Sequence, residues 1–254
     1  MGYIPIICIA RGCGLQSCSL LVGSTMATIR FTIEVGCEDE EPSRIIPAID
    51  GEILVRVGDS DEETKIGAIH AYLVLRGRAL NERVSLFEAM DSISQSVFDC
   101  YEALFDVETD DWNRSVESLY NGQILEPDVL FIERIELDAT FRGKGIGAQV
   151  VRESIATFGS SCGLVTCKPF PLQYENWEDK SRKALRQEPG FEEKRIADFA
   201  RVAKFWTNLS FRKLDDSDFY TYAPELINQT DPVSDTAPTA FPIRVPRGRR
   251  RRTR

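Results

Sequence analysis

Residues 129–158 constrain the fold of this chain more than any other stretch. They begin as an apolar, strand-like run that ends at Leu137, pass through a short turn, and continue with glycines at positions 143, 145 and 147 before a helical pattern that runs to Phe158. Glycines let backbone N–H groups approach an anion, and a helix N-terminus adds unpaired donors and a positive dipole end. The order therefore predicts an anion-binding loop, to which Arg142 and Lys144 bring positive charge.

Two common phosphate-binding motifs do not fit this loop. The Walker motif needs Gly-Lys followed by Ser or Thr, but Lys144 is followed by Gly145. The dinucleotide motif needs G-x-G-x-x-G, whereas the chain has G-x-G-x-G from Gly143 and then Ala148. The pattern that fits is Arg-x-x-Gly-x-Gly, formed by Arg142, Gly145 and Gly147. An ordinary strand-to-helix turn, in which the glycines only permit tight packing, is the alternative.

This motif, directly after a strand that ends in an apolar residue and Asp, resembles the acyl-CoA-binding motif of the GCN5-related N-acetyltransferase (GNAT) superfamily. The resemblance covers about residues 53–222 and is strongest at 131–158 and 199–223. It implies an α/β (α+β) fold with a mixed, mostly antiparallel, twisted sheet. In that fold a central parallel strand pair is splayed around an acyl-CoA cleft, and helices flank the sheet.

The second patch of resemblance departs from the family at two positions. Residues 205–211 are similar to the family's helix end, Phe-Tyr-x-x-Leu-Gly-Phe, but Trp206 stands where the family often has a tyrosine general acid. An indole N–H is no useful proton donor at neutral pH. Ser210 stands where glycine is usual and a positive φ is expected. Tyr220 and Tyr222 are alternative acids, although core packing also explains both.

The resemblance also implies the chemistry, in which an amine attacks the thioester of an acyl-CoA, here acetyl-CoA. The backbone N–H of Leu137 would stabilise the charge that develops on the carbonyl oxygen. The pantetheine arm would lie along Glu136, Leu137, Asp138 and Ala139, and the pyrophosphate would bind the N–H groups of Arg142, Gly143, Lys144, Gly145, Ile146 and Gly147.

Two carboxylates of the central strand are candidates for the general base that deprotonates the amine. Glu133 and Glu136 have opposite parity in the strand, so only one of them reaches the cleft unless the strand has a bulge. We favour Glu133, because members of the family often place a base near the start of this strand. The alternative is that both carboxylates pair with neighbours such as Arg134 or face water.

Length and composition predict one main domain. The 254 residues are 43% hydrophobic, and we place the domain at 26–224 with its core at 53–222. A net charge of −9 argues against a general nucleic-acid or membrane-surface role, and no apolar run is as long as a membrane span. Seven cysteines without a C-x-x-C pair, and a single histidine, predict a reduced, cytoplasmic chain without a metal site. We expect the chain to be a monomer or a homodimer.

The N-terminal half predicts strands followed by one long helix. Residues 1–25 are apolar and Cys-containing. They are either an extension of the domain or the result of a mis-assigned start, in which case translation begins at Met26. Strands are expected at 26–35, 52–57 and 65–75, with the last two forming an antiparallel hairpin. His70 lies in the third strand, where a lone histidine is expected to be a packed core residue. A single helix is expected over 84–105.

The C-terminal half predicts a helix at 145–158 and a short strand at 164–168, parallel to and beside the central one. The polar segment at 172–193 is either a variable or substrate-facing insertion or a solvated loop. It precedes a helix at 195–209 and two short strands at 211–214 and 219–222.

Residues 225–254 are expected to be disordered and end in seven arginines between 244 and 254. Without these seven charges, the net charge of residues 1–243 is −16. The run indicates nuclear targeting or nucleic-acid attachment, or an end that docks on the chain's own acidic body. Besides an N-acyltransferase, a catalytically weakened acyl-CoA-binding domain and a nucleic-acid-associated protein acting through this tail therefore stay open. The amine acceptor is not defined by the sequence.

Overall fold

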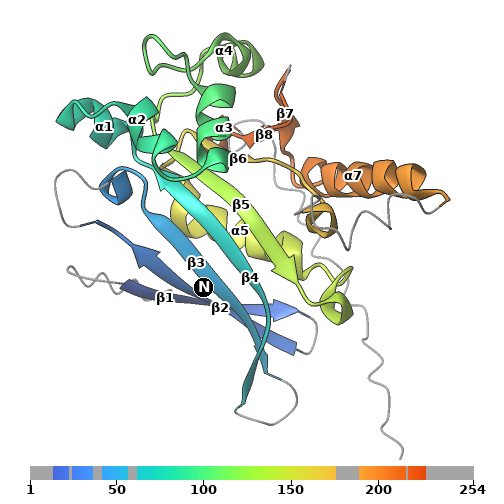
Figure 1. The fold of residues 1–254 in the computed structure, drawn as a ribbon. Helices are drawn as coiled ribbons and strands as arrows, with labels where there is room; N and C mark the ends of the chain where they lie inside the picture. Colours follow the sequence, from blue (N-terminus) through green and yellow to red (C-terminus); the bar gives the residue numbers. More distant parts are fainter. Residues whose placement is uncertain are drawn as a thin grey trace, which may run out of the picture.

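The computed structural model describes residues 14–22, 25–36, 42–56, 62–175, 189–215 and 217–226. Within these ranges eight strands form one mixed sheet in the order β1-β2-β3-β4-β5-β6-β8-β7 (Figure 1). Only β5 and β6 are parallel, so the predicted mixed sheet with one parallel pair is confirmed. The strands are β1 (Gly14–Val22), β2 (Thr25–Glu34), β3 (Ala48–Arg56), β4 (Glu63–Val74), β5 (Val129–Leu137), β6 (Leu164–Cys167), β7 (Arg212–Lys213) and β8 (Tyr220–Tyr222).

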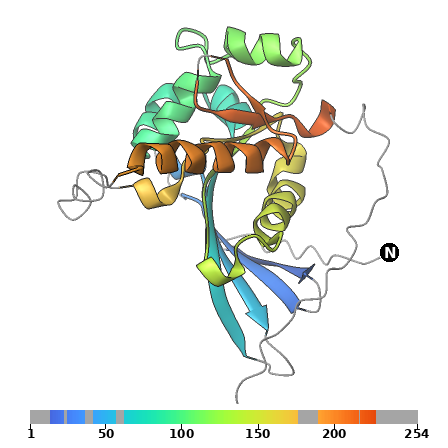
Figure 2. The ribbon, with the colours of Figure 1, turned by 90° about the vertical axis from the view of Figure 1, so that its right-hand side faces the viewer.

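Helices cover both faces of the sheet. Figure 2 shows α5 on one face and the group α1–α3 on the other, while α7 extends beyond the end of β6. None of the helices in the described ranges has both the length and the apolar character needed to cross a bilayer. The α-helices are α1 (Arg76–Glu82), α2 (Leu86–Asp91), α3 (Gln95–Leu104), α4 (Arg114–Tyr120), α5 (Ile146–Phe158) and α7 (Phe191–Thr207), and 3-10 turns lie at Pro42–Arg44, Ala139–Phe141, Gly159–Ser161 and Leu172–Tyr174.

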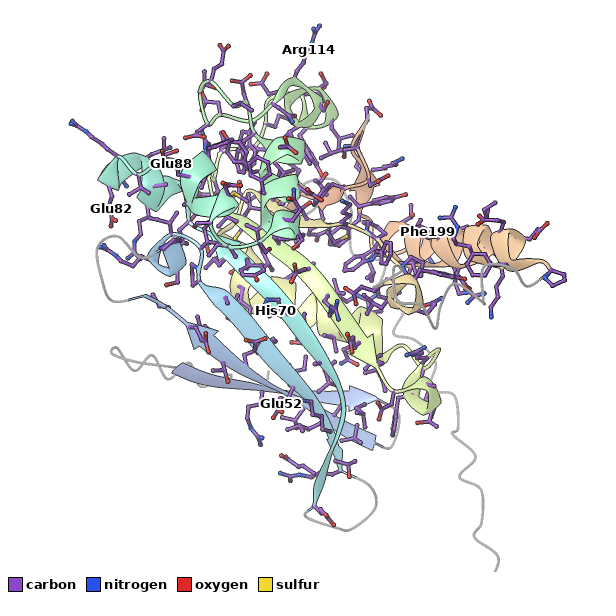
Figure 3. The ribbon with its side chains drawn as sticks, in the orientation of Figure 1. Glu52, His70, Glu82, Glu88, Arg114 and Phe199 are labelled. Carbon is purple, nitrogen blue, oxygen red and sulfur yellow. The ribbon has the colours of Figure 1, made fainter. Side chains whose placement is uncertain are left out.

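Alternation along the strands separates an apolar face from a polar one. Ile29 and Phe31 of β2 and Ile53 of β3 are fully buried against the side of the sheet that α5 covers. Burying each such side chain contributes about 1.5–3 kcal/mol. Their strand neighbours, such as Arg30 and Glu52, point to the opposite side, which the helices leave uncovered at this end (Figure 3). We call this side the polar face.

Most predicted elements are present with small shifts in their ends, including the β3–β4 hairpin and the parallel β5–β6 pair. Within the N-terminal segment 1–25, residues 14–22 form β1, which pairs with β2 along its whole length. Residues 1–13, the part of the polar segment at 176–188, and the arginine-rich tail beyond residue 226 lie outside the described residues.

The single helix predicted for 84–105 is wrong, because the chain forms two helices there. Ser92 follows the end of α2, and Ser94 has an extended backbone with φ −167° and ψ 162°. The Ser94 hydroxyl accepts a hydrogen bond from the Val97 N–H at 3.3 Å and so caps α3. A serine that can bond to its own backbone favours a helix start over a helix interior. The apolar stripe continues across the break because both helices pack on the same core.

We expect Ser94→Ala to lower the free energy of unfolding by about 1 kcal/mol, since it removes the N-cap of α3. Denaturant unfolding measures this loss. Ser118→Ala, on the exposed side of α4, is the control and should be near neutral. Equal stability of the two variants would show that the Ser94 hydroxyl is not a cap.

Candidate active site

The central strand β5 has an open edge, because it is much longer than its neighbour β6. The two strands pair only between Val129 and Phe131 on β5 and the facing residues of β6, whereas β5 continues to Leu137. The Asp138 N–H donates to the Ile66 carbonyl on the β4 side at 2.8 Å. Since backbone groups alternate along a strand, the N–H and C=O of Leu137 point to the opposite, open edge. The Arg142 Nε donates to that carbonyl at 2.8 Å.

A cleft of about 1240 Å³ runs along this open edge. Residues 133–137 of β5 form one wall, and the segment 168–175, which follows β6, forms the other together with α7. Phe205 and Trp206 of α7 supply apolar surface, and the glycines that precede α5 lie at one end. The pairing of β5 with β6 thus ends at Phe131, and the cavity lies beside the unpaired part of β5.

The opposite wall is held by polar contacts to two helices. The Tyr174 hydroxyl donates to the Asp198 carboxylate of α7 at 2.8 Å, and this bond is the main cause that lowers the pKa of Asp198. The Lys168 ammonium pairs with Asp99 of α3, also at 2.8 Å. These contacts fix the segment 168–175 at a distance from β5, so the cleft is built into the fold.

Two glycines of the loop adopt a left-handed backbone conformation. Gly143 and Gly145 have φ values of +71° and +83°, a region that other residues rarely adopt. A Cβ added at either position would meet nothing within 4 Å. Close packing therefore does not explain either glycine, while an ordinary strand-to-helix turn also accommodates both conformations. The first helical bond of α5 is that from Gln149 to the Gly145 carbonyl, which leaves the earlier N–H groups of the helix without intrahelical partners.

Eight of the ten residues predicted to contact the cofactor line the cleft. Two side chains do not: Lys144 lies over the Phe141 ring at 5.0 Å from its centre, and Ile146 is buried in the core beneath α5. At these two positions only the backbone is available to a ligand in the cleft. The lining residues are Glu136, Leu137, Asp138, Ala139, Arg142, Gly143, Gly145 and Gly147.

A β-bulge brings both candidate bases to the cleft. The β4–β5 register shifts so that His70 faces Arg134 while the next residue, Ala71, faces Ile132. Glu133 is therefore an extra residue, and the alternation of β5 reverses at this point. Glu133 and Glu136 consequently lie on the same side of the sheet despite their opposite parity, and both line the cleft.

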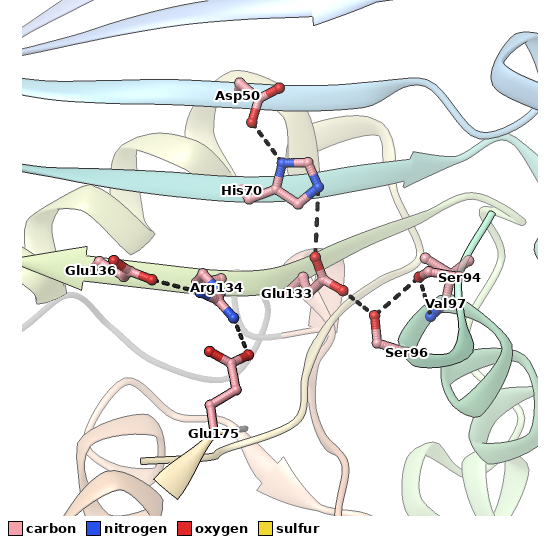
Figure 4. A network of polar contacts seen from close by, with 9 residues as sticks. All are labelled: Asp50, His70, Ser94, Ser96, Val97, Glu133, Arg134, Glu136 and Glu175. Carbon is pink, nitrogen blue, oxygen red and sulfur yellow. Dashed lines mark hydrogen bonds and ion pairs between the residues drawn. The ribbon is translucent and has the colours of Figure 1, made fainter. Parts of the chain in front are cut away.

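The two carboxylates have different partners (Figure 4). Glu136 accepts from the Arg134 guanidinium at 2.7 Å, and the same guanidinium also binds Glu175 across the cleft. Glu133 accepts from the Ser96 hydroxyl at the start of α3 and faces the His70 Nε2 at 3.6 Å. The expectation that Arg134 binds a neighbouring carboxylate is therefore confirmed for Glu136. Glu133 has no such cation beside it in the described ranges.

His70 is not the packed core residue that we expected. Its side chain is 27% exposed on the polar face, and its Nδ1 lies 2.7 Å from the Asp50 carboxylate of β3. The core-facing residues of β4 are the neighbours Ile69 and Ala71. Asp50, His70 and Glu133 therefore form a row across β3, β4 and β5 (Figure 4). Sequence reasoning missed this row because it depends on the register between strands, although the alternation of β3 and β4 indicated that Asp50 and His70 face outward.

Burial raises the pKa of Tyr72, which packs edge-on against His70 with ring centres 4.8 Å apart. The charges of Glu133 and Asp50 raise it further. Tyr72 thus stays a neutral phenol beside the row.

The position of the family's tyrosine acid is apolar here. Trp206 is 7% exposed, packs edge-on against Phe211 and lines the cleft. Tyr222 stacks on Phe211, and its burial raises its pKa, while neither it nor Tyr220 is among the residues that line the cleft. Both tyrosines thus pack on the core. Ser210 has φ +67°, which confirms the positive φ expected at this position.

Nothing in the described ranges brings three or more His, Cys, Asp or Glu side chains together as metal ligands. Cys100, Cys162 and Cys167 are buried free thiols, and burial raises the pKa of Cys162 to about 12, so none of them is an available nucleophile. The protein-family models, curated proteins and solved structures compared with this chain give no match, so its assignment rests on the geometry of the cleft.

Proposed function

We propose that this protein is an acyl-CoA-dependent N-acyltransferase that moves an acyl group, with acetyl as the expected one, from CoA to a primary amine. The observation that supports this proposal is the continuity of one cleft. The open edge of β5 runs directly into the loop formed by residues 142–147, and both border the same cavity. CoA has an extended pantetheine arm with amide groups and a charged pyrophosphate at one end. Such a molecule matches an open strand edge that is followed by a helix N-terminus.

In this arrangement the backbone supplies most of the donor's binding site. The unpaired N–H groups at the start of α5 would bind the pyrophosphate, with the Arg142 side chain nearby. Leu137 would bind the pantetheine arm through its edge-facing backbone groups, as a neighbouring strand would. Phe205 would pack against the arm's apolar parts.

The reaction needs three events at the thioester. The amine must lose a proton, and Glu133 would accept it, since its carboxylate lines the cleft and is held by Ser96. The amine nitrogen then bonds to the carbonyl carbon while a backbone N–H at the open edge stabilises the oxyanion. Collapse breaks the C–S bond, and the nitrogen loses its second proton to water. The CoA thiolate leaves and takes a proton from water, because no tyrosine is among the described residues that line the cleft.

That absence supports a second candidate function, an acyl-CoA-binding domain with weak or no transferase activity. It uses the same cleft and differs only in the catalytic step. Trp206, at the position of the usual acid, is the observation that favours it.

Calorimetric titration of the full-length chain with acetyl-CoA tests both candidates, and thiol release separates them. We expect binding, followed by amine-dependent release of CoA thiol when spermidine, a lysine-containing peptide or a peptide with a free N-terminus is added. Binding without thiol release for any of these amines would favour the second candidate. A folded chain that does not bind acetyl-CoA would contradict both.

A further inference from the structure

We propose that Asp50 and His70 form a proton relay that takes the amine proton from Glu133 to solvent on the polar face. The inference rests on the proposed function, because it assigns a role to residues behind its general base. His70 and Asp50 touch the reaction only through Glu133, so they are positioning residues. No resemblance in sequence points to them, and the structure alone brings them together.

The donors and acceptors of Asp50, His70 and Glu133 allow one arrangement of hydrogen bonds along the row. An ionised Asp50 can only accept, so the His70 Nδ1, 2.7 Å away, carries the proton of that bond. In the neutral imidazole this leaves Nε2 as an acceptor, and it faces the Glu133 carboxylate at 3.6 Å. Two acceptors face each other there until a proton arrives. A proton delivered to Glu133 can then pass to Nε2, which creates an imidazolium between two carboxylates.

The exposure of the three side chains gives the relay a direction. Glu133 and His70 are 25% and 27% exposed, whereas Asp50 is 58% exposed. Asp50 and His70 also line a second groove of about 450 Å³ on the polar face, which adjoins the cleft at Arg134 and Glu136. The row therefore leads from the cleft to a more exposed carboxylate on the polar face.

The other groups around His70 leave Glu133 as the partner of Nε2. Arg134 lies opposite His70 in the β4–β5 register, but its guanidinium is bound by Glu136 and Glu175. Tyr72 contacts the imidazole through an edge-to-face ring contact. Glu52, two residues beyond Asp50 on the same face, shows what an ordinary surface pair looks like, since it binds Lys65 at 2.9 Å and does not reach the row.

Nitrogen-15 NMR tests the geometry of the relay without any activity assay. His70 is the only histidine in the chain, so its imidazole signals need no assignment. We expect the wild type to show the tautomer protonated at Nδ1, Asp50→Asn to lose this preference, and Glu133→Gln to change the Nε2 signal. Glu52→Gln, the matched control on the same strand and face, should leave both signals unchanged. An imidazole that responds to neither Asp50→Asn nor Glu133→Gln would overturn the relay.

Thiol release from acetyl-CoA, with the most active amine of the three probes, tests the role in catalysis. We expect His70→Ala to lower kcat roughly 10- to 100-fold with little change in the KM for acetyl-CoA, since general-base catalysis is worth about 10²- to 10⁴-fold and Glu133 remains. Added imidazole should restore part of the rate, which it would not do for a purely structural residue. Full activity in His70→Ala would overturn the relay alone. A wild type that binds no acetyl-CoA would overturn the proposed function and the relay with it.

Discussion

Gly145→Asp should weaken acetyl-CoA binding by about 2–4 kcal/mol, or roughly 30- to 1000-fold, because one or two charge-assisted hydrogen bonds to the pyrophosphate would be lost. Gly145 is the N-cap of α5, and a Cβ there would point into open space at the end of the cleft. A carboxylate at this position would stand where the anion binds and repel it. Titration calorimetry of the full-length variant measures the loss.

The chain offers a matched control for this substitution. Gly122 follows α4, has φ +64°, and also has nothing within 4 Å of an added Cβ, but it does not line the cleft. Gly122→Asp therefore carries the same left-handed backbone strain, about 1–2 kcal/mol, and the same charge. It should lower stability as Gly145→Asp does and leave acetyl-CoA binding unchanged. If the two variants bind acetyl-CoA equally well, the pyrophosphate does not bind at the glycine loop.

The parts of the site that depend on local chain geometry could be predicted from the sequence. The apolar run that ends at Leu137, the glycines at 143 and 145, and the helix after them determine a strand, a left-handed turn and a helix N-terminus within a few residues. The parallel pairing of β6 with β5 follows from the connection rule for two strands joined by a helix. These predictions are confirmed because each depends on residues close in sequence.

The parts that depend on register could not be predicted in the same way. The extra residue at Glu133 reverses the alternation of β5. No residue type in that strand indicates that a bulge forms there. Without the bulge, Glu133 and Glu136 would point to opposite faces of β5, and only one of them could line the cleft. The break between α2 and α3 was missed for a related reason, because the apolar stripe continues across Ser94 although the backbone does not.

Glu133→Gln should lower kcat for amine acylation by about 100-fold or more, whereas the KM for acetyl-CoA should change little. Glutamine has nearly the same shape and can still accept the hydrogen bond from Ser96, so the variant removes the basic carboxylate and keeps the packing. Initial rates of thiol release, with acetyl-CoA and amine varied in turn, measure the two effects separately.

The same assay on Glu136→Gln decides between the two carboxylates of β5. Glu136 is bound by the Arg134 guanidinium, which in turn holds Glu175, so its carboxylate is engaged in an ion pair across the cleft. Its loss should therefore act on the binding of the donor more than on proton transfer, and raise KM with a smaller change in kcat. Glu52→Gln on the polar face controls for the loss of one negative charge. A large loss of kcat in Glu136→Gln, with Glu133→Gln fully active, would identify Glu136 as the base. It would also contradict the proton relay through His70 and Asp50, because Glu133 would then accept no proton from the amine.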